Sequence, residues 1–418
     1  MKFSNFLVPV FIGITLYEVS DVAFWANRFI PGMYSVILIF LSCIVLITTA
    51  TVSFNKCFDN MPSIYKKLFI FYWFFSLFTI TYGTLNAEAY YDYRHVFVDY
   101  VPSVIVSLSI LVGLRHVDFF LPLFKFIFKF ILPLALIFSF FVWFFVHGTV
   151  ERSATAYMPY HKSVSRMSLS IYLFVLAFPW LNFRARCLVF ILSIICILID
   201  LEWRFNILRI SICWFIVLVY YSNFLKPRFL NFIASLLVIL PLFLLYLGIE
   251  GSFDVFTVLS GTDLNVEIDK SNTRTWLYND VITTMQNRGT SFWYGGGAQA
   301  GYIPDFMYFS GRDFVFTEGR TITEVAFLNI LMKSGYIGII IYFFILLIPA
   351  YYAVNQSNND YCKVLGFYLV FIWVFTFLEH IQKFNANHFI IYLIIGICVS
   401  SSFRNLTNNQ VKEFFNEI

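Results

Sequence analysis

The chain has 418 residues, of which 60% are apolar and only 12% are charged, and its mean hydropathy is +0.78. A soluble domain carries roughly 25% charged residues and a disordered chain has low hydrophobicity, so the composition excludes both classes. The net charge of +4, with no basic stripe between aromatic residues, also speaks against a nucleic-acid-binding protein. The composition is that of a membrane protein with several spans.

Apolar runs predict an all-α fold with about twelve transmembrane helices, since each run is close to the ~20 residues that cross a bilayer. The first run ends near Glu18 and Asp21 and lacks a small-residue cleavage site, so we expect a retained span rather than a signal peptide. The predicted spans cover residues 6–25, 33–52, 68–86, 101–114, 130–146, 168–183, 187–201, 207–221, 229–247, 336–353, 364–377 and 389–399.

The distribution of positive charge favours an N-terminus on the inner side. With this orientation the inner segments collect half of the Lys and Arg residues, nearly all of them in short loops, as the positive-inside rule requires. The cysteines then fall in spans or inner loops, and no CxxC pair exists. We therefore expect neither a disulfide in the outer loops nor a bound metal or cofactor.

One polar segment, 249–323, separates spans nine and ten and divides the chain into residues 1–248, 249–323 and 324–418. A loop this long in a compact protein usually has a function. On the predicted orientation it lies on the outer side of the membrane.

Within this loop, apolar residues recur every four positions from Leu277 to Met285, which predicts an amphipathic helix. Asn272 or Thr273 can cap it and Gly289 can end it. We expect its apolar side to lie on the helical bundle. The glycine run 295–297 that follows has no preceding strand and no GKS/T ending, so a flexible turn is a better interpretation than a phosphate-binding loop.

Two arginines, Arg204 and Arg209, stand at the outer start of the eighth span, where the positive-inside rule disfavours them. Ionisable residues at membrane depth are candidates for function, and the planar guanidinium suits a phosphate or diphosphate. The alternatives are a salt bridge to Asp200 or Glu202, or contact with lipid headgroups.

A third arginine, Arg274, lies at the start of the predicted loop helix. Free N–H groups and the dipole favour anions at a helix N-terminus, so an arginine there makes a strong anion site. The alternative is a solvated charge paired with Asp269.

Glu324 precedes the tenth span and has two interpretations. Thr321 and Glu324 have the spacing of a capping box, which the local residues favour. Alternatively, a carboxylate partly removed from water has a raised pKa and can take a proton from a hydroxyl.

These residues, in this order along twelve spans, resemble the O-antigen polymerase and O-antigen ligase superfamily. The resemblance rests on the long loop between spans nine and ten, on Arg209, on Arg274 followed by an aromatic residue, and on the G-x-x-G turn at Gly335 and Gly338. The ligases carry a histidine eleven residues before the first glycine of that turn. Glu324 occupies this position here, which favours a polymerase.

The resemblance implies that the protein transfers a growing glycan from undecaprenyl diphosphate to the next lipid-linked repeat unit, as in O-antigen or capsule synthesis, without a metal or another cofactor. It implies catalytic roles for Arg209, Arg274 and Glu324. The implied partners are lipid-linked oligosaccharides, the bilayer and a chain-length regulator protein, and no nucleic acid. The further residues expected to bind substrate are Arg166, Arg204, Arg312 and Arg320.

Three other functions stay open. An O-antigen ligase would transfer the glycan to the lipid A core. A glycosyltransferase that uses polyprenyl-phosphate sugars would place acids such as Glu18 and Asp21 in its first outer loop, which is short here. A flippase or transporter would carry ionisable residues deep within its spans, where this chain has few.

Overall fold

The computed structural model describes residues 7–15, 32–58, 60–115, 117–141, 171–199, 204–221, 227–249, 273–303, 321–379 and 384–418. Within these ranges the regular secondary structure is helical, and the few isolated bridge positions include the pair Ser291 and Gly295. The all-α prediction is therefore confirmed for the described part of the chain.

The elements of the first half are α2 (Gly32–Phe58), α3 (Ser63–Leu85), α4 (Tyr90–Arg94), the π-helix η2 (His95–Tyr100), α5 (Val101–Ile105), η3 (Val106–Leu108), α6 (Ser109–Gly113), α7 (Val117–Phe126), η4 (Ile127–Ile131) and α8 (Leu132–Phe141). Those of the second half are α11 (Ile171–Leu176), η6 (Phe178–Trp180), α12 (Phe183–Ile199), α13 (Arg204–Tyr221), α14 (Pro227–Ile249), α16 (Thr273–Asn287), α18 (Ala326–Gln356), α19 (Asp360–Thr376), α20 (Ala386–Val399), α21 (Ser401–Arg404) and α22 (Asn408–Asn416).

Four helical stretches are long and apolar enough to cross a membrane: Ser63–Leu85, Tyr90–Gly113, Val117–Ile137 and Ala326–Gln356. Their apolar side chains are exposed over large areas; the Phe74 ring on α3, for example, is 75% exposed. Contiguous apolar surface of this kind is unfavourable in water and suits lipid. The chain thus has the character of a helical membrane protein, and the total of twelve spans stays a prediction.

The predicted fifth span starts thirteen residues after the start of the observed helix. Residues 130–146 were expected to span, whereas the helix starts at Val117 and continues through α7, η4 and α8. Lys125 and Lys129 interrupt the apolar run in sequence, and the prediction placed them in a loop. In the structure both lie within the helix, and Lys125 donates to the Glu417 carboxylate at 3.2 Å.

Helices α6 and α20 pack with their backbones in direct contact. A Cβ atom on Gly396 would lie 2.2 Å from the carbonyl oxygen of Ile110, and one on Gly113 would lie 2.3 Å from that of Leu393. Small residues let helices approach this closely in membranes, where van der Waals packing is a main attraction between helices. The crossing explains why two glycines occur in otherwise bulky apolar segments.

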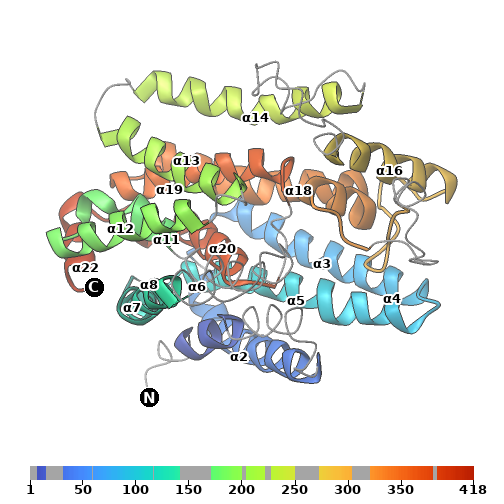
Figure 1. Cartoon of the computed structure of the whole chain (residues 1–418), viewed down its shortest axis with the longest axis horizontal. Helices are drawn as coiled ribbons and strands as arrows, with labels where there is room; N and C mark the ends of the chain where they lie inside the picture. Colours follow the sequence, from blue (N-terminus) through green and yellow to red (C-terminus); the bar gives the residue numbers. More distant parts are fainter. Residues whose placement is uncertain are drawn as a thin grey trace.

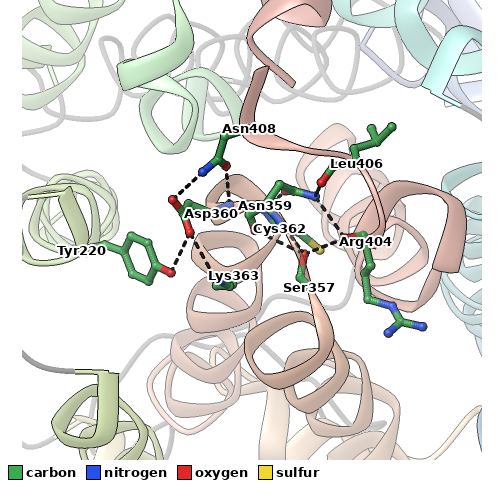
Figure 2. A network of polar contacts seen from close by, with 9 residues as sticks. All are labelled: Tyr220, Ser357, Asn359, Asp360, Cys362, Lys363, Arg404, Leu406 and Asn408. Carbon is green, nitrogen blue, oxygen red and sulfur yellow. Dashed lines mark hydrogen bonds and ion pairs between the residues drawn. The ribbon is translucent and has the colours of Figure 1, made fainter. Parts of the chain in front are cut away.

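A polar network at the start of α19 fixes the C-terminal segment (Figure 2). The buried Asn359 amide donates to the carbonyl of Phe403 at 2.9 Å, and its oxygen accepts from the backbone N–H of Cys362 at 2.8 Å. Asp360 next to it accepts from the Asn408 amide at 2.8 Å. The C-terminal helices α21 and α22 are thereby tied to the turn between α18 and α19.

The bundle has two distinct ends along its long axis (Figure 1). At one end lie α16 and α4, and at the other lie α22 and the C-terminus. We call the first the loop end, because it holds α16 and residues 288–303. Helix α19 starts at the opposite end, in the network of Figure 2, and finishes at the loop end.

At the loop end, α18 is broken at Gly335, whose φ of 63° and ψ of −164° are non-helical. The glycine run fits against this break. The backbone N–H groups of Gly296 and Gly297 donate to the carbonyls of Met332 and Lys333 at 2.9 and 3.0 Å. The run lies among turns, as expected, and its backbone is anchored to α18, where the glycines allow the close approach.

Gly335 and Gly289 offer a direct test of this packing. Both have a φ near +62°, but a Cβ on Gly335 would lie 2.4 Å from the backbone of Trp293, whereas a Cβ on Gly289 meets nothing within 4 Å. Gly289→Ala should cost about 1–2 kcal/mol, the strain of a left-handed residue, and Gly335→Ala should cost several kcal/mol more. Thermal unfolding of both variants in detergent measures the difference, and equal destabilisation would contradict the close packing.

Candidate functional site

The Arg209 side chain lies in the interior of the bundle, within the second turn of α13, and is 3% exposed. Its guanidinium carbon lies 5.4 Å from the ring centre of Tyr172 on α11 and 5.8 Å from that of Phe375 on α19. Tyr172, Tyr368 and Glu379 interact with it electrostatically. Cations stack favourably on aromatic faces, so rings and one carboxylate together hold this charge at the loop end. Asp200 and Glu202, the alternative partners, lie outside the described residues.

Glu379 follows the C-terminal end of α19, and this end is a meeting point of three segments. Its backbone carbonyl accepts from the N–H of Ala326, the first residue of α18, at 3.0 Å. The hydroxyl of Tyr278 on α16 donates to the Phe377 carbonyl at 2.9 Å, and the rings of Phe327 and Phe377 stack at 4.5 Å. The loop helix and the start of α18 are thus both fixed at the C-terminal end of α19.

Helix α16 is the amphipathic helix that the sequence predicts within the long loop. The side chains of Leu277, Tyr278, Val281 and Met285 are buried, whereas Asn279 is exposed. The helix ends where expected, at Gly289, whose positive φ reverses the chain. Its apolar side lies on the bundle.

Arg274 belongs to the first turn of α16, as predicted, and its side chain lies outside the described part. Arg274 and Tyr278 are four residues apart and share one helix face, about 6 Å apart along the axis. Because Tyr278 donates to the Phe377 carbonyl, the helix that begins near Arg274 is docked at the same end of α19 as the Phe375 ring that lies next to Arg209.

The capping box expected at Glu324 does not form. Helix α18 begins at Ala326 with Val325 as its N-cap residue, and Asn329 binds the backbone of Thr323 instead, at 2.7 and 3.0 Å. Asn329 can make both bonds because its amide is donor and acceptor, which a carboxylate is not. The Glu324 side chain is exposed on the segment that leads into α18.

The structure leaves the other predicted arginines untested. The Arg204 backbone begins α13, but its side chain is outside the described residues, as are Arg166, Arg312 and Arg320 entirely. Sequence reasoning also missed residues that the structure places around Arg209. Tyr172 and Tyr368 could not be distinguished among 26 tyrosines, whereas Glu379, an acid just after a predicted span, was a usable signal.

No family model, curated protein or solved structure matches the chain. In the described part of the chain, no group of three His, Cys, Asp or Glu side chains is arranged to hold a metal ion. The residues at the loop end are therefore the candidate functional site of the described part of the chain.

Tyr278→Phe tests whether α16 is docked through the bond to Phe377. Loss of one buried hydrogen bond costs about 1 kcal/mol, so amide exchange of α16 should become roughly fivefold faster, which hydrogen–deuterium exchange measures. Asn279→Ala changes the exposed neighbour and should leave the exchange unchanged. Equal exchange in Tyr278→Phe and the unmodified protein would contradict the docking.

Proposed function

We propose that the protein is a polymerase of lipid-linked oligosaccharide repeat units, acting at the outer face of a bacterial inner membrane. The proposal is supported by the placement of two arginines: the Arg209 guanidinium is buried among aromatic rings beside the end of α19, and Arg274 belongs to the first turn of α16, which is docked on that end. The pair supports a site for the diphosphate of an undecaprenyl diphosphate carrier, because both a helix N-terminus and guanidinium groups favour phosphate.

The proposed reaction makes a simple electrostatic demand. Negative charge grows on the diphosphate as the glycosidic bond breaks, so cations fixed next to it stabilise the transition state more than the ground state. The lipid diphosphate carries its own activation, and the reaction needs no nucleotide. Arg204, whose backbone begins α13, is proposed to contact the diphosphate as well, and Arg166, Arg312 and Arg320 are proposed to contact the sugars or phosphates.

The proposed orientation is supported by charge at the opposite end of the bundle. Lys363 and Arg404 lie in or beside the network of Figure 2, at the start of α19. Both were expected on the inner side by the positive-inside rule. The acceptor hydroxyl also needs a base, a role that the family resemblance implies for Glu324, and a chain-length regulator is a proposed partner.

Glycan analysis after gene deletion tests the proposed function itself. Loss of a polymerase leaves a single repeat unit on the acceptor. Loss of a ligase leaves no unit there, and loss of a flippase strands the lipid-linked unit on the inner side. A deletion strain that still makes full-length polymer, or that shows either of the other two outcomes, would contradict the polymerase proposal.

Arg274→Ala and Arg209→Ala test the diphosphate site. Removing one charge-assisted contact to a buried diphosphate costs on the order of 2–5 kcal/mol, so polymer formation should fall ~30- to several-thousand-fold. Arg288→Ala is the matched control, because Arg288 is an exposed arginine just after the other end of α16. Glycan ladders on gels, normalised to membrane protein level, give the readout. Normal ladders in the first two variants would refute the assignment.

A further inference from the structure

A second polar cluster lies at the loop end, where the helical stretch Tyr90–Gly113 changes its winding. Residues His95–Tyr100 form the π-helix η2, and such segments occur frequently at functional sites. His95 Nδ1 lies 2.7 Å from an Asp99 carboxylate oxygen, one turn later. The side chains of His95 and Asp99 are 26% and 33% exposed, so small molecules can reach them.

Lys333 on α18 interacts electrostatically with the Asp99 carboxylate of this pair. It is buried near the end of the first part of α18, and its ammonium lies 5.5 Å from the ring centre of Tyr100. The Tyr100 hydroxyl lies 3.3 Å from Ser334 Oγ. Because Gly297 bonds to the Lys333 carbonyl, the glycine run holds this part of α18 in place. The cluster is therefore fixed by several elements.

The Asp99 carboxylate favours the His95 tautomer that carries its proton on Nδ1. A carboxylate that accepts from Nδ1–H leaves the lone pair on Nε2, which can then take a proton. The Thr321 hydroxyl lies 3.2 Å from Nε2 and 3.1 Å from Nδ1. An aliphatic hydroxyl thus fits against this ring, and a sugar hydroxyl is the same chemical group.

The segment 321–326 connects the pair to the arginine site. Thr321 contacts His95 at one end, and Ala326 is bonded to Glu379 beside Arg209 at the other. Five residues extend at most ~18 Å, so the histidine and the arginine lie at the two ends of one short segment. Glu324 is exposed between them.

We propose that His95, positioned by Asp99, is the base that activates the acceptor hydroxyl; this inference rests on the proposed polymerase function. Nε2 takes the proton of the acceptor hydroxyl as its oxygen bonds to the anomeric carbon of the growing chain. The bond from that carbon to the diphosphate oxygen breaks, and the diphosphate leaves with the electron pair. The proton on His95 then passes to water or to the released diphosphate.

The test is an elongation assay in membranes, with the lipid-linked oligosaccharide that a deletion strain accumulates as substrate. General base catalysis contributes typically 10²–10⁴-fold, so His95→Gln should lower the elongation rate at least ~100-fold at neutral pH. Arg288→Ala changes an exposed arginine outside the cluster and should leave the rate unchanged. Asp99→Asn should lower the rate less than His95→Gln and change its pH dependence.

The pH profile separates catalysis from a structural role. The titratable groups around the ring on the described elements are Asp99 and Tyr100 on its own helix, Lys333 on α18, and Glu324 beyond Thr321. A general base acts only in its unprotonated form, so the rate of the unmodified protein should rise with pH and this rise should vanish in His95→Gln. A structural defect would lower the rate equally at every pH.

Three outcomes would overturn the inference. An unchanged rate in His95→Gln contradicts it, and so does a uniform loss that leaves the pH profile intact. If Glu324→Gln instead loses both the rate and the pH-dependent rise, the base is Glu324. The proposed function is judged separately: if the unmodified protein does not elongate the substrate, both proposals fail, whereas elongation that requires Arg274 but not His95 removes only this one.

Discussion

The C-terminal end of α19 is the constraint on which the loop end depends. Its last carbonyls have no partner within their own helix, and two of the residues there are bonded by other segments. Phe377 accepts from Tyr278 of the loop helix, and Glu379 accepts from Ala326 at the start of α18. A charged side chain, Arg209, lies beside the same turn. The end of one helix thus positions a loop, a broken helix and a buried cation together.

The break in α18 at Gly335 also holds a second segment in place, because it lets the glycine run bond to α18. A continuous helix would leave the carbonyls of Met332 and Lys333 within its own hydrogen-bond pattern and leave no room for the glycine run. The non-helical Gly335 lets Gly296 and Gly297 donate to these carbonyls, and it ends the short helical piece, residues 326–334, that carries Lys333. Arg209 lies near the start of this helical piece, because Glu379 interacts with Arg209 and is bonded to Ala326. Asp99 lies near its end, because Asp99 interacts with Lys333.

Much of the fold could be predicted from sequence, because apolar runs and four-residue spacing are local signals. The loop helix α16 and its end at Gly289 followed from such spacing. The anchored glycine run could not be predicted, since its contacts come from segments that are distant in sequence. His95 and Asp99 had a usable signal, the i, i+4 spacing of one helix face. The predicted span began at residue 101, so the pair was assigned to a loop and passed over.

The account's central claim is that a lipid diphosphate binds at the loop end, between Arg209 and the first turn of α16. The most direct measurement is an experimental structure of the protein in lipid nanodiscs with undecaprenyl diphosphate added. The account predicts density for the diphosphate within hydrogen-bonding distance of the Arg209 guanidinium and of the residues that begin α16. A diphosphate bound at the opposite end, beside Arg404 and Lys363, would contradict it.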